Sequence, residues 1–301
     1  MAPTPVPGAP FGRVLTAMVT PMTRDGALDL DAAQRLATHL VDRGNDGLVV
    51  SGTTGESPTT TDEEKERLLR AVVEAVGDRA HVVAGVGTND TAHTVELARK
   101  AEKTGVTGLL VVTPYYSKPP QAGLIEHFGR AADATGLPVM LYDIPARSGV
   151  PITTETLLTL AEHDRIAAVK DAKGDLHETA KVLAGSDLAV YCGEDAINLP
   201  MLALGAVGVV SVVAHVCAAE YAAMVRAVDA GDLAEARRIN AAVLPAVRGV
   251  MTRTQGAIMA KAALELLGVI PSRATRSPLV DATDEQMTLL RADLVEAGLP
   301  L

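Results

Sequence analysis

Residues 138–171 read PVMLYDIPARSGVPITTETLLTLAEHDRIAAVKD. Two runs rich in Val, Ile, Leu and Ala, at Pro138–Asp143 and Ile166–Asp171, flank an amphipathic segment at Thr154–Glu162. Continuous apolar runs are typical of strands buried on both faces, and their alternation with helices is typical of a parallel sheet. This stretch therefore predicts a strand, a helix and a second, parallel strand.

The same unit recurs along most of the chain, which gives eight apolar runs in total. Eight parallel strands can close into a barrel without exposed edges, so we predict a (β/α)8 TIM barrel over residues 13–231. An open dinucleotide-binding sheet is the alternative, but Gly85-Val-Gly87 lacks the third glycine of that fingerprint. The apolar runs are Val14–Thr20, Gly47–Ser51, His81–Gly85, Gly108–Thr113, Pro138–Asp143, Ile166–Asp171, Leu188–Cys192 and Gly208–Val212, and the helical segments among them are Leu30–Arg43, Glu63–Val76, Thr91–Lys103, Leu124–Ala134 and Thr154–Glu162.

Different patterns flank the predicted barrel. Residues 232–301 predict a C-terminal helical domain, in which Pro245 is expected to end or kink one helix. Residues 1–12 are rich in Pro and Ala and lack the basic start and apolar core of a signal peptide, so we expect a flexible extension. The expected helices after the last strand are Ala218–Ala230, Leu233–Leu244, Gly256–Leu267 and Asp284–Ala297.

Composition narrows the functional classes. The 301 residues carry a formal charge of -10, whereas nucleic acids and anionic membranes bind basic surfaces, so we expect neither partner. The stretch from Ala203 to Ala219 is the most hydrophobic, but glycines and His215 interrupt it, and a membrane span needs ~18 apolar residues. Cys192 and Cys217 lie in apolar stretches and are interpreted as core residues, which fits a reducing, cytoplasmic location.

Lys170 is the first candidate site residue. Reactive side chains of TIM barrels lie at the carboxyl ends of strands, and Lys170 directly follows the apolar residues 166–169. A desolvated amine keeps a neutral, nucleophilic fraction, which is what Schiff-base chemistry needs. A solvated lysine paired with Asp171 is the alternative, and position alone leaves both open.

A glycine-containing loop follows the second predicted strand and reads Gly52-Thr-Thr-Gly-Glu-Ser57. Its glycines let the backbone turn, so that backbone N–H groups and two hydroxyls converge on a carboxylate or phosphate. The alternative is a tight turn whose hydroxyls cap the next helix. The loop is not a P-loop, because no Gly-Lys-Ser/Thr follows it.

Tyrosines gather at two strand ends. Three of the five tyrosines lie in Thr113-Pro-Tyr-Tyr116 and Tyr142-Asp-Ile-Pro-Ala-Arg147. A phenol at such a place can relay protons, although packing beneath a loop is the alternative. Arg147 adds a planar fork that suits a carboxylate, while a solvent-facing arginine is the commoner situation.

Metal and hydrolytic sites find little support. The seven histidines are scattered, and neither a metal-binding spacing of histidines nor a G-x-S-x-G elbow occurs. His215 is interpreted as a hydrogen-bonded core residue and Cys192 as packing. We therefore expect no metal ion.

Together, Gly52-Thr-Thr-Gly-Glu56, Pro114-Tyr-Tyr116, Tyr142-Asp-Ile-Pro145 and Val169-Lys170 resemble the dihydrodipicolinate synthase / N-acetylneuraminate lyase family. The resemblance spans nearly the whole chain after the first dozen residues. It implies a pyruvate-dependent lyase that needs no cofactor beyond an imine between Lys170 and pyruvate.

The resemblance also implies a role for each matching residue. Tyr142, Thr53 and Tyr116 are expected to form a proton relay with Lys170, and Tyr116 is expected to reach the active site of a neighbouring subunit. Substrate binding is expected at Thr54, Gly193 and the backbone of Val210. A hydroxyl relay agrees with the several proton transfers that imine and enamine formation require.

Arg147 indicates which activity of that family this chain has. Its guanidinium suits the carboxylate of L-aspartate 4-semialdehyde, which a polyhydroxy sugar chain does not offer, so we expect a synthase of diaminopimelate and lysine biosynthesis. A sugar-acid aldolase is the alternative within the family, and a non-catalytic barrel that binds a small acid is the alternative outside it. Asp143 departs from the asparagine that the family more often has.

The resemblance bears on regulation and assembly as well. Family members inhibited by lysine use histidine and glutamate side chains at positions held here by Asp62, Lys65 and His93. A cationic Lys65 would oppose a cationic effector, so we expect weak or absent feedback by lysine. A tyrosine supplied across an interface implies a homo-oligomer, and the family commonly forms a homotetramer.

Overall fold

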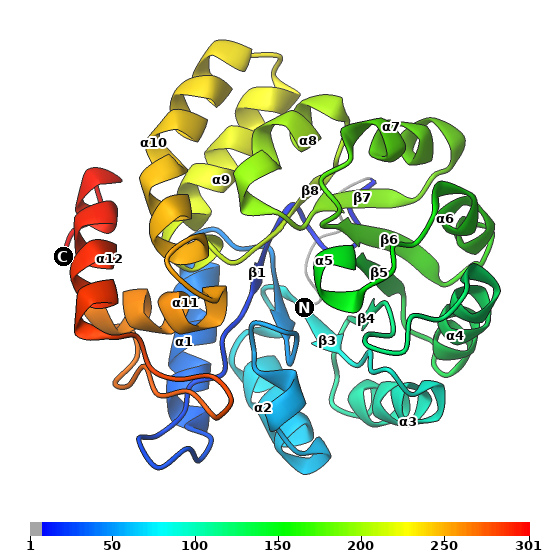
Figure 1. Cartoon of the computed structure of the whole chain (residues 1–301), viewed down its shortest axis with the longest axis horizontal. Helices are drawn as coiled ribbons and strands as arrows, with labels where there is room; N and C mark the ends of the chain where they lie inside the picture. Colours follow the sequence, from blue (N-terminus) through cyan, green and yellow to red (C-terminus); the bar gives the residue numbers. More distant parts are fainter. Residues whose placement is uncertain (1–7) are drawn as a thin grey trace.

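The computed structural model describes residues 8–301 and shows a closed barrel of eight parallel strands in the order β1 to β8 (Figure 1). The strands are β1 (Val14–Ala17), β2 (Gly47–Val50), β3 (His81–Gly85), β4 (Gly108–Val112), β5 (Val139–Asp143), β6 (Ile166–Asp171), β7 (Ala189–Cys192) and β8 (Gly208–Ser211). The predicted (β/α)8 TIM barrel is therefore confirmed.

Helices connect successive strands and form the outer layer of the barrel (Figure 1). They are α1 (Leu30–Asp42), the 3-10 turn η1 (Ser57–Thr59), α2 (Asp62–Val76), α3 (Thr91–Glu102), α4 (Gln121–Asp133), α5 (Pro145–Ser148), α6 (Thr154–Ala161), α7 (Leu176–Gly185), the 3-10 turn η2 (Asp195–Ile197) and α8 (Asn198–Leu204). After β8 come α9 (Ala214–Asp229), α10 (Leu233–Met251), α11 (Gly256–Leu266) and α12 (Asp284–Glu296).

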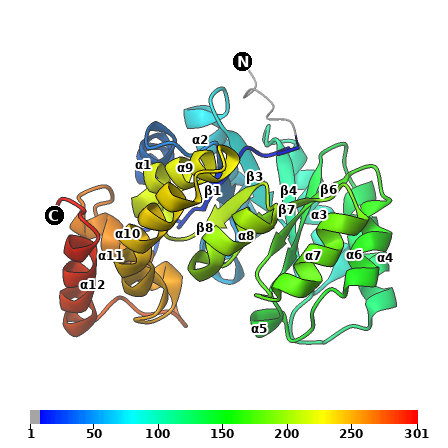
Figure 2. The same cartoon turned by 90° about the horizontal axis from the view of Figure 1, so that it is seen from above.

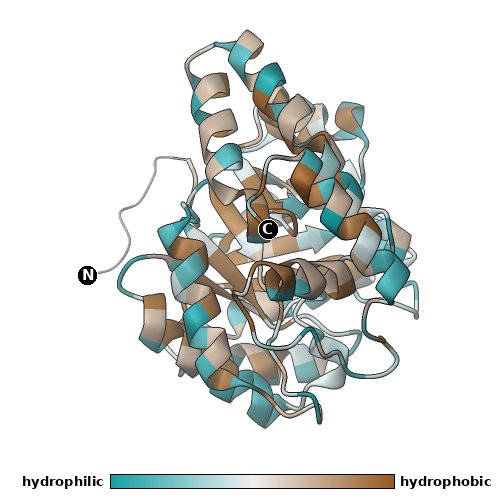
Figure 3. Ribbon diagram, turned by 90° about the vertical axis from the view of Figure 1, so that its left-hand side faces the viewer, coloured by the Kyte–Doolittle hydropathy of each residue, from teal (hydrophilic) through white to brown (hydrophobic). Residues whose placement is uncertain are grey.

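Apolar side chains fill two layers of the barrel. Figure 3 shows hydrophobic strands at the centre and helices with mixed surfaces around them. The larger core lies between the strands and the helices, and the smaller one fills the interior of the barrel with residues such as Leu15, Val83 and Met140. Alternation of side chains across each strand supplies both layers, which explains why the strands are apolar on both faces.

The amino-terminal end of the barrel is closed by Phe11. Its side chain is fully buried in the interior core, and the Tyr191 hydroxyl on β7 donates a hydrogen bond to the Gly12 carbonyl at 2.9 Å. The predicted flexible extension of residues 1–12 is wrong for residues 8–12, because burial of Ala9 and Phe11 fixes this segment to the barrel. Residues 1–7 lie outside the described residues.

The C-terminal helices α10, α11 and α12 lie beside the barrel, with α10 between α9 and α12 (Figure 2). Asp293 on α12 accepts hydrogen bonds from Arg248 and Arg253, which joins α12 to α10 and the residues after it. Of the two outcomes expected at Pro245, the end of the helix is wrong, since α10 continues to Met251 with Pro245 inside it, and the kink stays a prediction. Packing of its buried side chains on both neighbours outweighs the one missing hydrogen bond.

Candidate active site

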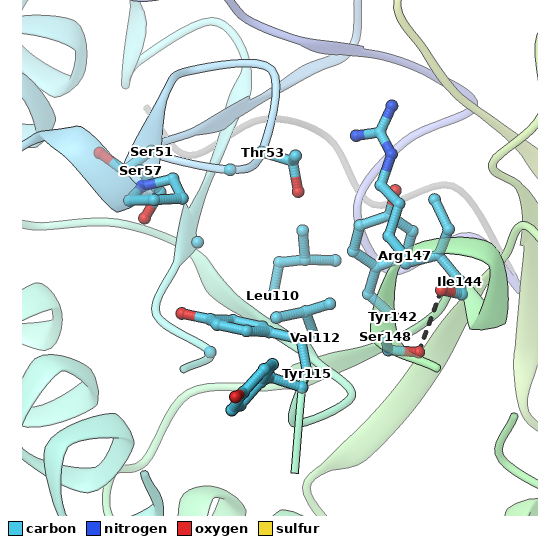
Figure 4. A pocket seen from close by; sticks show the side chains of 15 residues that line it. Ser51, Thr53, Ser57, Leu110, Val112, Tyr115, Tyr142, Ile144, Arg147 and Ser148 are labelled. Atoms are coloured by element: carbon cyan, nitrogen blue, oxygen red, sulfur yellow. Dashed lines mark hydrogen bonds between the residues drawn. The ribbon is translucent and has the colours of Figure 1, made fainter. Parts of the chain in front are cut away.

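A pocket of about 310 Å³ opens among the loops that follow β2, β3, β4 and β5 (Figure 4). Thr53 and Arg147 face each other across it, and Tyr142 lies below Arg147 (Figure 4). The carboxyl ends of barrel strands are where TIM-barrel enzymes place their active sites. The pocket is lined by Ser51, Gly52, Thr53, Ser57, Pro58, Gly85, Gly87, Leu110, Val112, Tyr115, Tyr116, Tyr142, Ile144, Arg147 and Ser148.

Lys170 adjoins this pocket through Tyr142. The two residues are register partners on β6 and β5, and the Lys170 amine lies 4.2 Å from the centroid of the Tyr142 ring. Lys170 is only 4% exposed, so its amine is held inside the barrel mouth and away from bulk water. Because a Cβ at position 193 would come within 2.8 Å of the Lys170 side chain, glycine at that position leaves room for the lysine.

The loop of residues 52–57 turns tightly at the rim of the pocket. Ser51 and Glu56 both have a left-handed backbone, at φ 59° and 58°, and the Glu56 N–H donates to the Thr53 carbonyl at 3.1 Å. Left-handed backbone at such residues costs about 1–3 kcal/mol and persists where surrounding contacts hold it. Thr53 is partly exposed to the pocket and Thr54 is buried beside it.

Contacts with residues of the C-terminal segment hold that loop. Glu56 is 3% exposed, and its carboxylate pairs with the fully buried Lys261 of α11 and accepts the Arg276 backbone N–H at 2.9 Å. The Arg276 guanidinium in turn donates to the carbonyl of Thr59 and to both carboxylate oxygens of Glu64. Arg276 lowers the pKa of Glu64 to about 2. The candidate anion-binding loop is thus fixed by residues that follow the barrel in sequence.

The two predicted tyrosine clusters meet in this pocket. Tyr142 is 5% exposed, whereas Tyr116 is 89% exposed and has a left-handed backbone at φ 75°. The Thr113 hydroxyl donates to the Tyr142 carbonyl at 3.1 Å, which ties the end of β4 to the end of β5. Tyr142 is therefore buried with its backbone tied to the end of β4, while Tyr116 projects from the rim of the subunit.

Arg147 lies on the short helix α5, which begins with Pro145 and ends at Gly149 in a left-handed conformation. The Ser148 hydroxyl donates to the carbonyls of Ile144 and Val150, which closes the turn (Figure 4). The Arg147 side chain is exposed at the pocket and makes no hydrogen bond or ion pair within residues 8–301. Its guanidinium is therefore available to a carboxylate in the pocket.

Comparison with known proteins identifies the family. Residues 10–297 match the model of the dihydrodipicolinate synthetase family. The chain belongs to that family. It is 69% identical to the 4-hydroxy-tetrahydrodipicolinate synthase of Kineococcus radiotolerans over 97% of this chain and 95% of the relative. It is 63% identical to 4-hydroxy-tetrahydrodipicolinate synthase 2 of Streptomyces coelicolor over the full length of both.

Solved structures of this family have the same fold. The crystal structure of DHDPS from Cyanidioschyzon merolae with lysine bound is 43% identical, with a TM-score of 0.93. It covers 97% of this chain and 99% of that chain. Fold and family therefore agree with the resemblance drawn from the strand-end residues.

The predicted site residues of this family member are not all in the pocket itself. Thr53, Tyr116, Tyr142 and Arg147 line it, whereas Lys170 adjoins Tyr142. Thr54, Gly193 and Val210 are not lining residues; Gly193 packs on Lys170, and Val210 lies in the barrel interior in the same cluster as Tyr142. Sequence reasoning missed Lys261 and Arg276, although a single lysine in the apolar segment Gly256–Leu266 was a signal.

His215 and Cys192 are both buried in the protein core. His215 accepts the Val19 N–H through Nε2 and donates to the Val212 carbonyl through Nδ1, and burial lowers its pKa to about 4, so the predicted core role is confirmed. Burial disfavours the charged form of Cys192 as well, and so raises the pKa of its thiol. In the part of the chain that the structure describes, no group of three His, Cys, Asp or Glu side chains could hold a metal ion, and no helix is long and apolar enough to cross a membrane.

Proposed function

We propose that this family member is a 4-hydroxy-tetrahydrodipicolinate synthase, which condenses pyruvate with L-aspartate 4-semialdehyde in the diaminopimelate pathway to lysine. The observation that carries the proposal is the buried Lys170 amine against the Tyr142 ring, beside a pocket rimmed by the free Arg147 guanidinium. The 63–69% identity to proteins of that name supports the same activity.

In this mechanism the neutral Lys170 amine attacks the ketone carbon of pyruvate, and the carbinolamine loses water to form an imine. Removal of a methyl proton gives an enamine, whose carbon forms a bond with the aldehyde carbon of the semialdehyde. The semialdehyde amine then attacks the imine carbon, which closes the ring and releases Lys170. No redox partner or metal ion is needed to balance these steps.

The proton transfers are assigned to hydroxyls around the pocket. Tyr142 adjoins the position of the imine, since its ring lies beside the Lys170 amine, and Thr53 lines the same pocket. Thr54 and the backbone of the same loop would hold the pyruvate carboxylate, with Gly193 and the Val210 backbone bordering the imine. Fixed hydroxyls in a water-poor pocket can pass protons without exchange with bulk water.

Tyr116 is assigned to the active site of a neighbouring subunit. Its 89% exposure and left-handed backbone fit a side chain that is ordered by a partner and not by its own subunit. We therefore propose a homo-oligomer, with a homotetramer as the expected form. The buried free thiols fit a reducing compartment, and we propose a cytoplasmic location.

Borohydride reduction in the presence of pyruvate, followed by peptide mass mapping, tests the covalent step. We expect one pyruvate-derived adduct on the peptide that contains Lys170. An unmodified protein, or an adduct on another lysine, would refute the proposed mechanism.

Kinetics of Arg147→Ala tests the second substrate. We expect a rise of roughly 100-fold in KM for the semialdehyde, because a charge-assisted, bidentate contact is lost, with KM for pyruvate unchanged. Arg130→Ala is the matched control, since Arg130 on α4 is exposed and paired with Glu126. Unchanged semialdehyde kinetics in Arg147→Ala, or faster turnover of sugar acids than of the semialdehyde, would favour the aldolase alternative.

A further inference from the structure

A buried ion pair between Asp143 and Lys173 lies next to Tyr142 and Lys170 of the proposed site, on the outer side of the barrel strands. Tyr142 and Lys170 are register partners, and so are the next residues along, Asp143 and Asp171. Because side chains alternate across a strand, Tyr142 and Lys170 face the barrel interior and the two aspartates face the outer layer. Asp143 is fully buried, and its Oδ2 lies 3.3 Å from the amine of Lys173, whose side chain is 8% exposed.

Both members of the pair hold the backbone of the same residue, Ile152. Asp143 Oδ1 accepts the Ile152 N–H at 3.1 Å, and the Lys173 amine donates to the Ile152 carbonyl at 3.5 Å. Asp143 also accepts the Ala172 N–H through its backbone carbonyl at 2.9 Å. The segment between Asp143 and Ile152 is therefore closed into a loop at its base, and this loop carries α5 with Arg147.

The charge of Lys173 helps to keep the buried Asp143 carboxyl ionised. Burial raises the pKa of Asp143 to about 6, the Lys173 ammonium opposes that rise, and Asp171 adds to it. Asp171 itself accepts the Lys173 backbone N–H and the Thr179 hydroxyl, at 2.9 Å and 2.6 Å. Without Lys173, the buried Asp143 carboxylate would lose its cation and keep the repulsion of Asp171, which favours protonation of Asp143.

We propose that Asp143 and Lys173 are positioning residues, which fix the base of the Arg147 loop and so set the affinity for the carboxylate of the second substrate. Neither side chain lines the pocket, so the pair acts through Arg147 and not by contact with substrate. The inference rests on the proposed function, because it takes Arg147 as the group that binds the semialdehyde. It also gives a purpose to Asp143 at a position where the resembling family more often has asparagine.

Kinetics of three variants tests this inference: Lys173→Met, Asp143→Asn, and the double variant. Each single variant leaves one buried charge without its partner, whereas the double variant has none and its asparagine still accepts the Ile152 N–H. We expect KM for the semialdehyde to rise roughly tenfold in each single variant, short of the ~100-fold that a 1 Å misplacement can cause, and to recover within about twofold in the double variant. Lys181→Met, in an exposed pair with Glu178, is the matched control.

The pH profile separates positioning from a general loss of structure. In Lys173→Met the acid limb of kcat/KM for the semialdehyde should move to higher pH, because the pKa of Asp143 rises when its cation is removed. KM for pyruvate and borohydride trapping on Lys170 should stay as in the unsubstituted enzyme. In an Arg147→Ala background, Lys173→Met should have no further effect on semialdehyde kinetics.

Two results would overturn the inference. One is unchanged semialdehyde KM in both single variants; the other is an equal loss for both substrates that the double variant does not recover. Failure of the proposed function looks different, because it would appear in the unsubstituted protein as absent trapping on Lys170 or absent turnover of the semialdehyde.

Discussion

Two buried lysines of this molecule have opposite surroundings. The Lys170 amine lies over the Tyr142 ring, and within residues 8–301 it has no carboxylate or carbonyl partner. Lys261 is fully buried, pairs with Glu56 and donates to the Ala274 carbonyl at 2.7 Å. Burial alone therefore does not make a lysine a nucleophile: a free amine beside a pocket is suited to chemistry, whereas one paired with a carboxylate and a carbonyl is suited to holding two segments together.

The largest expected effect is that of Lys170→Met. The substitution removes the proposed nucleophile, so we expect kcat to fall by about a thousandfold or more while the protein stays folded. Turnover and the melting temperature are the measurements. Residual trapping of pyruvate on Lys261 would break the comparison, because it would show that the paired lysine also reacts.

Lys261→Met should lower the stability of the protein and not the rate of the chemical step. Removing one partner of a buried ion pair leaves Glu56 uncompensated, so we expect a loss of about 3–5 kcal/mol in the free energy of unfolding. Denaturant titration measures it. The double variant Glu56→Gln/Lys261→Met should recover most of the loss, and a single variant as stable as the unsubstituted protein would contradict the expectation.

In Glu56→Gln, the free energy of unfolding should depend more steeply on pH in the alkaline range. Burial already lowers the pKa of Lys261, and loss of the carboxylate that opposes this effect lowers it further. The unfolded chain then binds more protons than the folded one up to the ordinary lysine pKa of 10.5, so stability rises with pH, more steeply than in the unsubstituted protein. Unfolding titrations from neutral pH to pH ~10 measure the slope, and equal slopes would contradict the expectation.

The smallest expected effect concerns a third buried lysine, Lys65. Its amine donates to the Thr60 carbonyl at 2.5 Å, and Asp62 nearby is held by His93 and Lys100, each at 3.1 Å. A relative at 43% identity has been crystallised with lysine bound, but here these groups already have partners. We expect free lysine at ~1 mM to change the rate less than twofold. Half-inhibition at sub-millimolar lysine in a steady-state titration would contradict this.

The strands and their polar ends could be predicted because each depends on a local pattern. Buried parallel strands are continuous apolar runs, so Lys170 and Tyr142 stood out at their ends. Short helices were less visible: α8 has seven residues and contains Pro200. Proline in a first turn lacks only an N–H that would have no partner in the helix, so α8 forms despite it.

Contacts between distant segments could not be predicted in this way. Glu56 and Lys261 are 205 positions apart, and only the packing of α11 beside the barrel brings them together. The pairing of Asp143 with Lys173 likewise depends on the register of β5 and β6. Local patterns thus identified residues that face the pocket, while the residues that hold them in place required the tertiary structure.

Closure of the barrel sets the order in which the chain can be completed during synthesis. β1 pairs with β8, and the Arg13 carbonyl accepts the Val209 N–H at 2.8 Å. Translation at about 5–20 residues per second means that the first strand waits roughly 10–40 seconds for its second neighbour to leave the ribosome. During that time Phe11 and the apolar face of β1 lack the neighbours that bury them in the finished barrel. A nascent chain that contains β1 but not yet β8 is therefore the stage at which chaperone binding is most needed.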